Sequence, residues 1–377
     1  MGARYVVAPD RLLAGHGVRV DGEGRIAALE PVEDDGAGGG ADFVAPGLID
    51  LQVNGFAGED LHACDEGGFA RICRALPAHG VTGFLPTLIS APAPALLDRL
   101  ALLAGWLGER RDAATPLGVH LEGPFLAPAR RGAHPAEGLA RPDPVLLDEL
   151  CAAAGPALRL LTLAPELPGA LDLVEAATAR GVVVALGHSE ADAATVRAAV
   201  ARGARLVTHC GNAMPPITAR EPGLAGAALV EPALRVAVIA DGVHVAPEFL
   251  RLAHAAKGAG LVLTSDAISG AGLGDGRHLL GGREVHVAGG VARDPDGRLA
   301  GSTTGLFAAT AGFAAAVACS PVQAFLAAAS GPADLLGTDD RGALSPGRRA
   351  DLLRLRAGAC GWALVAVHRG GRILTLA

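Results

Sequence analysis

The sequence predicts a (β/α)8 TIM-like barrel that carries a small β-sandwich domain formed by the N- and C-terminal segments. From residue 46 to residue 340, short apolar runs alternate with Ala- and Leu-rich helical stretches. Repeated β–α units of this kind favour a closed parallel barrel covered by helices. Residues 1–45 and 341–377 instead contain short strand-like runs separated by Gly and Asp turns. The length of 377 residues suits a barrel with one small extra domain.

Eight apolar runs are the candidate barrel strands, each bounded by Gly, Pro or polar residues. Amphipathic stretches such as PALLDRLALLAGWLGER and LDLVEAATARG lie between most of them and are expected to form outer helices. The candidate strands are residues 47–53, 80–89, 116–122, 158–166, 181–188, 205–210, 235–242 and 260–267.

The two ends of the chain are expected to pair in one β-domain, made of residues 1–45 and 341–377. Barrel termini lie close together, so this pairing needs no long crossover. Residues 46–340 would form the catalytic barrel. Within it, residues 278–302 break the β–α alternation, and their Gly- and Asp-rich turns predict a β-hairpin insertion.

Composition excludes several classes of protein. A net charge of −7 and an aromatic content of 3% argue against a nucleic-acid binder, which needs a basic face. No apolar stretch reaches the ~20 residues of a membrane span, and the N-terminus shows no signal pattern. Six cysteines without a CxxC pair predict free thiols in a reducing compartment. A soluble cytoplasmic protein is therefore expected.

Four polar residues stand at or near the ends of separate candidate strands: Glu122, His188, His209 and Asp266. Active sites of β/α barrels form where strand ends converge. One carboxylate and two imidazoles are a typical catalytic set for a divalent ion, with one position left for water. Zinc is the expected metal, and Fe²⁺ and Co²⁺ tolerate the same ligands. The alternatives are a salt bridge for Glu122 and hydrogen-bonded core histidines.

Asp266 is the candidate for proton transfer. A divalent ion lowers the pKa of a bound water towards ~7. A carboxylate within hydrogen-bond reach can take that proton and then hand it to a leaving nitrogen. The alternatives for Asp266 are a further metal ligand or a helix N-cap in the string TSDA.

A second group of residues lies in loops just beyond the strand ends: His134, Asn212, Arg220 and His244. A guanidinium and two imidazoles can bind a phosphate or polarise a carbonyl. Taken singly, each residue is better explained as a solvated loop position. Their shared location at one barrel face makes the functional interpretation as good as that alternative. Asp241 could orient His244, and a plain turn aspartate explains it equally well.

Together these motifs resemble the N-acetylglucosamine-6-phosphate deacetylases of the amidohydrolase superfamily. The tail GALSPGRRADLL resembles the closing segment of the superfamily. The matching strings run in family order over residues 45–310: APGLIDLQVNG, HLEGPFL with GAH, LGHS, THCGNAMPPITAREPGL, IADGVHV, LTSDA and LAGS.

The resemblance implies a role for each matching residue. Glu122, His188 and His209 would hold one metal ion, and Asp266 would act as general base and then general acid. His134 would polarise the acetyl carbonyl or stabilise its oxyanion. The positions implied for the sugar phosphate are Asn212 with the backbone of Ala213, Arg220 and His244.

The implied reaction is hydrolysis of the acetamide of N-acetylglucosamine 6-phosphate to glucosamine 6-phosphate and acetate, in a homodimer. Three alternatives stay open. One is the same chemistry on N-acetylgalactosamine 6-phosphate. Another is a mononuclear amidohydrolase acting on a different acylated amine, and the third is a non-catalytic barrel that binds amino-sugar phosphates.

Three differences from related patterns bear on the site. Many amidohydrolases carry His-x-His at the end of the first strand, where this chain has Gln52-Val53-Asn54. Amides ligate such metals poorly, so one metal is expected. Lys257, the only lysine, precedes the last strand, which argues against a carbamylated-lysine bridge. Cys210-Gly211 stands where the deacetylases that the chain resembles often have a larger Leu-Tyr pair. The sequence therefore does not predict the shape of the sugar pocket.

Overall fold

The barrel forms as the sequence predicts. The computed structural model describes residues 1–32, 42–110, 112–358 and 361–374. Eight parallel strands form the barrel, and each lies inside one of the eight predicted ranges. A bridge between Val53 and Ala267 brings the first strand against the segment after the last one. The barrel strands are β6 (Leu48–Val53), β9 (Val81–Leu88), β11 (Val119–Glu122), β12 (Leu158–Leu163), β13 (Val183–Leu186), β14 (Leu206–Val207), β15 (Arg235–Val238) and β16 (Leu261–Leu263).

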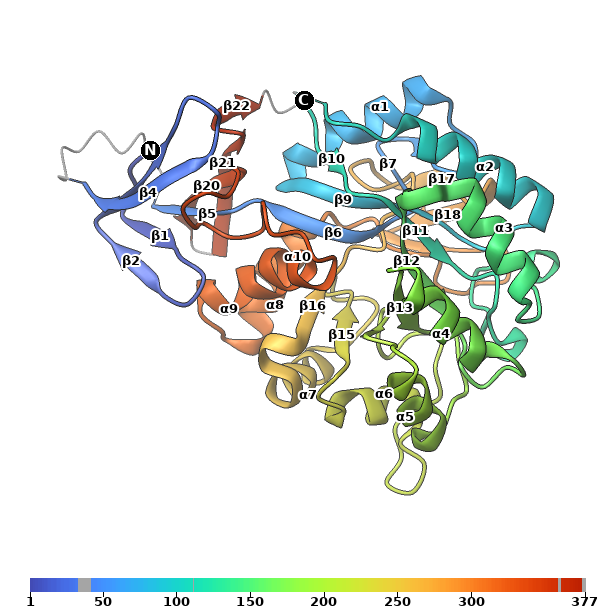
Figure 1. The fold of residues 1–377 in the computed structure, drawn as a ribbon. Helices are drawn as coiled ribbons and strands as arrows, with labels where there is room; N and C mark the ends of the chain where they lie inside the picture. The colour runs from blue at the N-terminus through green and yellow to red at the C-terminus, as the bar shows by residue number, and fades with distance from the viewer. Residues whose placement is uncertain (33–41, 111, 359–360, 375–377) are drawn as a thin grey trace.

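Helices surround these strands, as Figure 1 shows. Apolar side chains fill the inside of the barrel, with Leu160, Leu206 and Val262 almost fully buried. A larger apolar layer lies between strands and helices, which is the packing expected of this architecture. The helices are α1 (Glu66–Ala75), α2 (Ala93–Trp106), α3 (Pro144–Ala154), α4 (Ala170–Ala179), α5 (Ala193–Ala201), α6 (Gly223–Val230), α7 (Pro247–Lys257), α8 (Leu306–Val317), α9 (Pro321–Phe325) and α10 (Gly331–Leu335).

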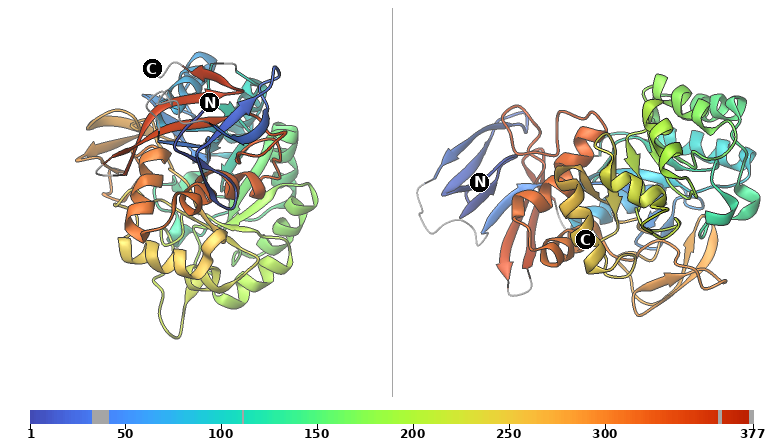
Figure 2. Two further views of the ribbon diagram at one scale, coloured as in Figure 1. Left: turned by 90° about the vertical axis from the view of Figure 1, so that its left-hand side faces the viewer. Right: turned by 90° about the horizontal axis from the view of Figure 1, so that it is seen from below.

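Strands from both ends of the chain share one six-stranded sheet, beside the barrel in Figures 1 and 2. Its order is β2 (Leu12–Ala14), β1 (Tyr5–Val7), β5 (Phe43–Pro46), β20 (Leu352–Gly358), β21 (Gly361–Arg369) and β22 (Arg372–Leu374). The two ends meet where β5 pairs antiparallel with β20. A separate hairpin joins β3 (His16–Val20) to β4 (Ile26–Pro31). The domain limits at residues 45 and 341 stay a prediction.

The predicted hairpin insertion is a three-stranded antiparallel sheet. Its strands are β17 (Gly276–Leu280), β18 (Arg283–Ala288) and β19 (Val291–Arg293), so it begins before residue 278 and contains a strand more than a hairpin. Gly281 and Gly282 form the first turn with φ of 62° and 74°. Two positive φ values suit the right-handed twist of the strands and favour glycine. Figure 2 shows this sheet projecting from the barrel away from the small β-domain.

Two composition-based predictions can be compared with the described residues. The described cysteines are all free thiols, as predicted, and the sixth, Cys360, lies outside the described residues. No helix in the described part of the chain has the length and apolar character needed to cross a membrane.

Candidate active site

The four predicted site residues lie at or just beyond strand ends, and three of them have a strained backbone. Glu122 is the last residue of β11, and His188, His209 and Asp266 follow β13, β14 and β16. The φ values of these last three residues are 48°, 26° and 53°, and Ala213 has 52°. Such values cost free energy for residues other than glycine and concentrate at functional sites. Only two other non-glycine residues in the described chain share this property, Ala57 and Ala318.

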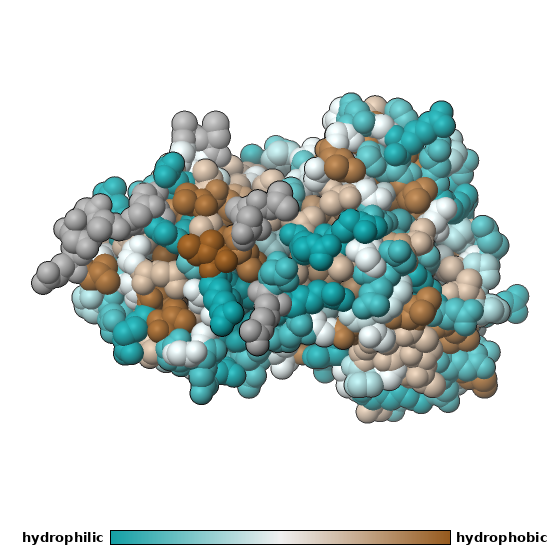
Figure 3. All heavy atoms as spheres, turned by 90° about the horizontal axis from the view of Figure 1, so that it is seen from above, coloured by the Kyte–Doolittle hydropathy of each residue, from teal (hydrophilic) through white to brown (hydrophobic). Residues whose placement is uncertain are grey.

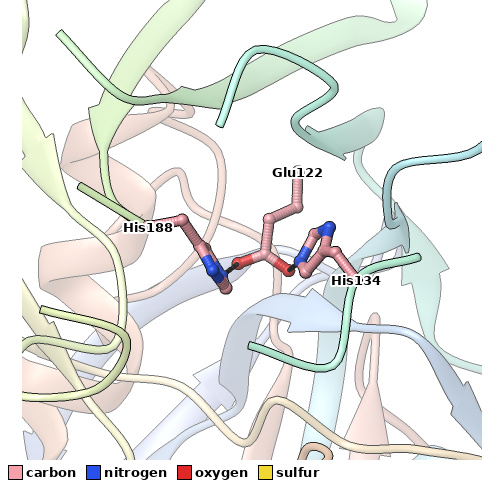
Figure 4. A group of neighbouring side chains, drawn as sticks. All are labelled: Glu122, His134 and His188. Atoms are coloured by element: carbon pink, nitrogen blue, oxygen red, sulfur yellow. Dashed lines mark ion pairs between the residues drawn. The ribbon is translucent and has the colours of Figure 1, made fainter. Parts of the chain in front are cut away.

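The Glu122 carboxylate lies among three imidazoles. Its Oε1 is 2.9 Å from Nε2 of His209 and 3.3 Å from Nε2 of His188. Its Oε2 is 3.4 Å from Nε2 of His134. Figure 4 shows Glu122 between His134 and His188, whose ligand atoms all lie within 4.8 Å of one another. Nε2 of His188 and Nε2 of His209 are 3.1 Å apart. The structure thus brings together the three predicted metal ligands and adds His134 beside them.

Hydrogen bonds distinguish the three imidazoles. Nδ1 of His188 is 2.9 Å from the carbonyl oxygen of Arg130, so it carries a proton and leaves Nε2 as an electron-pair donor. Nδ1 of His134 instead accepts from the backbone N–H of Ser90 at 3.2 Å, which places the proton of neutral His134 on Nε2. His134 is therefore set up as a hydrogen-bond donor. Nδ1 of His209 has no partner among the described residues.

The protonation states of Glu122 and His188 favour the binding of a cation in this cluster. Burial opposes ionisation of Glu122, but its polar contacts with His134, His188 and His209 outweigh it and hold its pKa well below the usual value. Burial would lower the pKa of His209, yet its hydrogen bond to Glu122 and the charges of Glu122 and Asp266 raise it. Burial is the main cause that lowers the pKa of His188, to about 4. A neutral imidazole beside an ionised carboxylate is the state that binds a divalent cation.

Asp266 is buried and held by an amide. Asn54 Nδ2 donates a hydrogen bond to Asp266 Oδ1 at 2.7 Å. Burial and the charge of Glu122 raise the pKa of Asp266 to about 7. Efficient proton transfer needs a group whose pKa lies near the working pH. Asn54 belongs to the Gln52-Val53-Asn54 string, whose amides predict only that one metal ion is bound; no local pattern in the sequence indicates its hydrogen bond to Asp266.

The cluster opens into a cavity of about 320 Å³. Glu122, the three imidazoles and Asp266 line it, together with the predicted substrate residues Asn212, Ala213 and His244. Nδ1 of His244 lies 2.8 Å from Asp241 Oδ2, and Asp241 Oδ1 accepts the backbone N–H groups of Val243 and His244. This aspartate therefore forms the turn and also orients the imidazole, so both interpretations hold. Although burial opposes it, the hydrogen bond from His244 lowers the pKa of Asp241 to about 2.

Arg220 is not part of this cavity. It is exposed in the loop before α6, unlike His244 and Asn212. The three-stranded insertion instead contributes Leu280, and the segment after β19 contributes Arg298 and Leu299. Sequence reasoning missed these residues because no local motif marks a loop that folds back over a distant strand end.

We expect Gly187→Ala to destabilise the site region by about 1–3 kcal/mol, the usual cost of overpacking. A Cβ at this position, between β13 and His188, would lie 2.3 Å from Cγ2 of Thr208 and 3.1 Å from Cγ2 of Thr162. Denaturant unfolding measures the change in free energy. Gly105→Ala in α2 is the control, since nothing lies within 4 Å of its added Cβ. Equal unfolding midpoints for Gly187→Ala and the unmodified protein would contradict the close packing.

A parallel barrel with a carboxylate and imidazoles at its strand ends defines a barrel hydrolase built to hold a divalent cation. The chain belongs to the amidohydrolase family, which matches residues 43–362. It is 40% identical over 336 residues to N-acetylglucosamine-6-phosphate deacetylase of Homo sapiens, covering 86% of this chain and 82% of the relative. It is 36% identical over 357 residues to N-acetylgalactosamine-6-phosphate deacetylase of Escherichia coli O157:H7, covering 94% of each.

Solved structures agree with this placement. The crystal structure of N-acetyl-D-glucosamine-6-phosphate deacetylase from Mycobacterium smegmatis is similar with a TM-score of 0.91 and 32% identity, covering 99% of each chain. A mutant of the M. smegmatis enzyme in complex with N-acetyl-D-glucosamine-6-phosphate has a TM-score of 0.90 and 31% identity, covering 99% of this chain and 98% of that one.

Proposed function

We propose that this chain hydrolyses the acetamide of N-acetylglucosamine 6-phosphate, releasing glucosamine 6-phosphate and acetate. The observation that carries the proposal is the arrangement of Glu122, His188, His209 and Asp266 around one cavity. The similarity to deacetylases over most of the chain supports the substrate class. A cytoplasmic location is part of the same proposal.

Glu122, His188 and His209 are the proposed ligands of one divalent ion, with zinc expected and iron or cobalt as alternatives. The donor set fits such an ion because His188 directs a free electron pair into the cluster and Glu122 is ionised. When bound, a divalent ion supplies Lewis acidity, which polarises an oxygen and makes water easier to deprotonate.

The chain's own groups handle the protons. Asp266, oriented by Asn54, would accept a proton from the attacking water and return it to the departing amine nitrogen. Nε2–H of His134 would donate a hydrogen bond to the acetyl oxygen as negative charge develops there. Burial of both side chains excludes bulk water and strengthens these interactions.

His244, Asn212 and the backbone of Ala213 are the proposed contacts to the sugar phosphate. Asp241 fixes the ring of His244 at the cavity wall. The exposed position of Arg220 suits a role at the cavity of a neighbouring subunit in the proposed homodimer. A solution measurement of mass tests the dimer.

The second candidate substrate is N-acetylgalactosamine 6-phosphate. It is supported by the similarity to N-acetylgalactosamine-6-phosphate deacetylase of E. coli O157:H7, which covers 94% of both chains.

Acetate release from four sugars is the test of this function. We expect the highest kcat/KM with N-acetylglucosamine 6-phosphate. Removing the phosphate should lower kcat/KM by about tenfold or more, because each charged hydrogen bond contributes about 1.5–3 kcal/mol. The four substrates are the gluco and galacto sugars, each with and without phosphate. A preference for the galacto sugar would select the second candidate, and equal rates with and without phosphate would reject both.

A further inference from the structure

A second cavity, of about 220 Å³, lies where turns of the small β-domain meet the loop after α2. It shares no lining residue with the active-site cavity. One wall is the turn between β3 and β4, and another is the turn between β21 and β22. Seen from above, hydrophilic side chains gather at the middle of the surface, between the small β-domain and the barrel (Figure 3).

Positive charge is in excess around this second cavity. Its charged lining consists of four arginines and two glutamates: Arg25, Arg349, Arg369, Arg372, Glu23 and Glu109. Asp351, whose Oδ2 lies 3.4 Å from Nε of Arg349, offsets one further charge, so the arginines exceed these carboxylates by one. A volume of this size holds a tetrahedral oxyanion with some water, since each water molecule takes about 30 Å³.

Arg369 is the unusual member of this set. The residue is only 4% exposed. Its Nε and Nη2 have no hydrogen-bond partner within residues 1–32, 42–110, 112–358 and 361–374. The nearest carboxylate oxygen to Nη2 is Oε1 of Glu109, at 3.8 Å. A buried guanidinium with unpaired N–H groups is costly unless something accepts its hydrogen bonds.

Glu109 does not supply a hydrogen-bond acceptor for the Arg369 guanidinium. Its Oε1 already accepts from Nη1 of Arg349 at 2.5 Å and lies 3.9 Å from Nη2 of Arg341. One exposed carboxylate oxygen therefore faces three guanidinium groups. Burial lowers the pKa of Arg369, Asp351 raises it, and the positive charge of Arg349 lowers it further. A multivalent anion would relieve this concentration of like charge.

We propose that the second cavity binds a phosphate group, either as free inorganic phosphate or as part of a phosphomonoester. Arg369 is the buried anchor, and Arg25, Arg349 and Arg372 close around the anion. Guanidinium groups suit this task because their paired N–H groups match two phosphate oxygens at once. The bound anion would bridge Arg25 of the N-terminal segment to the arginines of the C-terminal segment and stabilise the folded protein by mass action. This proposal does not depend on the proposed deacetylase activity.

Calorimetric titration with inorganic phosphate tests the site. The main variant combines Arg25→Gln and Arg372→Gln, because both side chains are exposed and can be changed without opening the core. The matched control combines Arg74→Gln and Arg197→Gln, two exposed arginines outside the cavity. All titrations are repeated in a His244→Gln background, which disturbs the other cavity.

We expect the cavity variant to weaken phosphate binding by about tenfold or more, as the loss of charged hydrogen bonds predicts. The control should change it by less than about twofold, since distant exposed charges are screened by salt. Phosphate should also raise the melting temperature of the unmodified protein more than that of the cavity variant.

Arg369→Gln removes the proposed anchor alone and is therefore the more specific single change. If that variant fails to fold, the double variant of Arg25 and Arg372 tests the site instead. A parallel titration with glucose 6-phosphate identifies the source of the phosphate group. Tighter cavity binding of the sugar phosphate points to a phosphomonoester, and tighter binding of inorganic phosphate points to the free anion. Identical isotherms for the unmodified protein, the cavity variant and the control would overturn the proposal.

Discussion

Asp266→Asn is expected to lower kcat by about 10²–10⁴ while the metal stays bound, because it removes a general base without removing a proposed ligand. Asparagine keeps the size of the side chain and can still meet Asn54, which now donates to Asp266 Oδ1 at 2.7 Å. It cannot accept a proton at neutral pH. The loss should therefore fall on kcat, with a small change in KM.

Rates of acetate release and metal content measured on the same sample check this expectation. Asp98→Asn is the control, since Asp98 is an exposed aspartate in α2. Near-normal turnover by metal-loaded Asp266→Asn protein would reject the assigned role. Loss of the metal would instead show that Asp266 is a ligand, the alternative that the sequence left open.

His209→Ala is expected to remove the metal, and His134→Ala to leave it in place. Two overlapping sets could in principle hold an ion, since Glu122 and His188 combine with either His209 or His134. The proton positions favour His209, because the Ser90 N–H occupies Nδ1 of His134 and leaves a proton on Nε2. His188→Ala would lose the metal in both cases and does not distinguish them.

The readout is metal affinity, measured by competition with a chelator. Loss of a true ligand should exceed the roughly 10–100-fold loss typical of groups that only orient ligands. His134→Ala should retain near-normal affinity and lose turnover, because it removes a donor to the developing oxyanion. Metal loss in His134→Ala with retention in His209→Ala would reverse the proposed ligand set.

The barrel could be predicted from the sequence because its strands are short, buried and apolar. Runs such as VVVAL and LVL stand out against Ala-rich amphipathic helices, and the polar residue that ends each run marks the functional face. This pattern predicts Glu122, His188, His209 and Asp266 as site residues. Their convergence follows from barrel closure, which fixes where every strand ends.

The parts that escaped prediction depend on contacts between distant segments. Ser90 sets the proton position of His134 across 44 residues of chain, and Asn54 reaches Asp266 across 212. The same holds for Arg298 at the active-site cavity and for Arg369 at the second cavity. No local pattern encodes such contacts, because each depends on how two loops pack after the barrel has closed.

The pairing of β5 with β20 has a consequence for the order of synthesis. Val44 in β5 pairs with Arg354 in β20, which is synthesised about 300 residues later. One edge of β5 therefore stays unpaired until β20 has been made. During translation, that edge presents unpaired N–H and C=O groups, which favour association with other chains. Strand β20, near the C-terminus, therefore covers an edge of β5 that the N-terminal part of the chain leaves unpaired. Truncated chains that end before β20 are expected to aggregate even though every barrel strand is present.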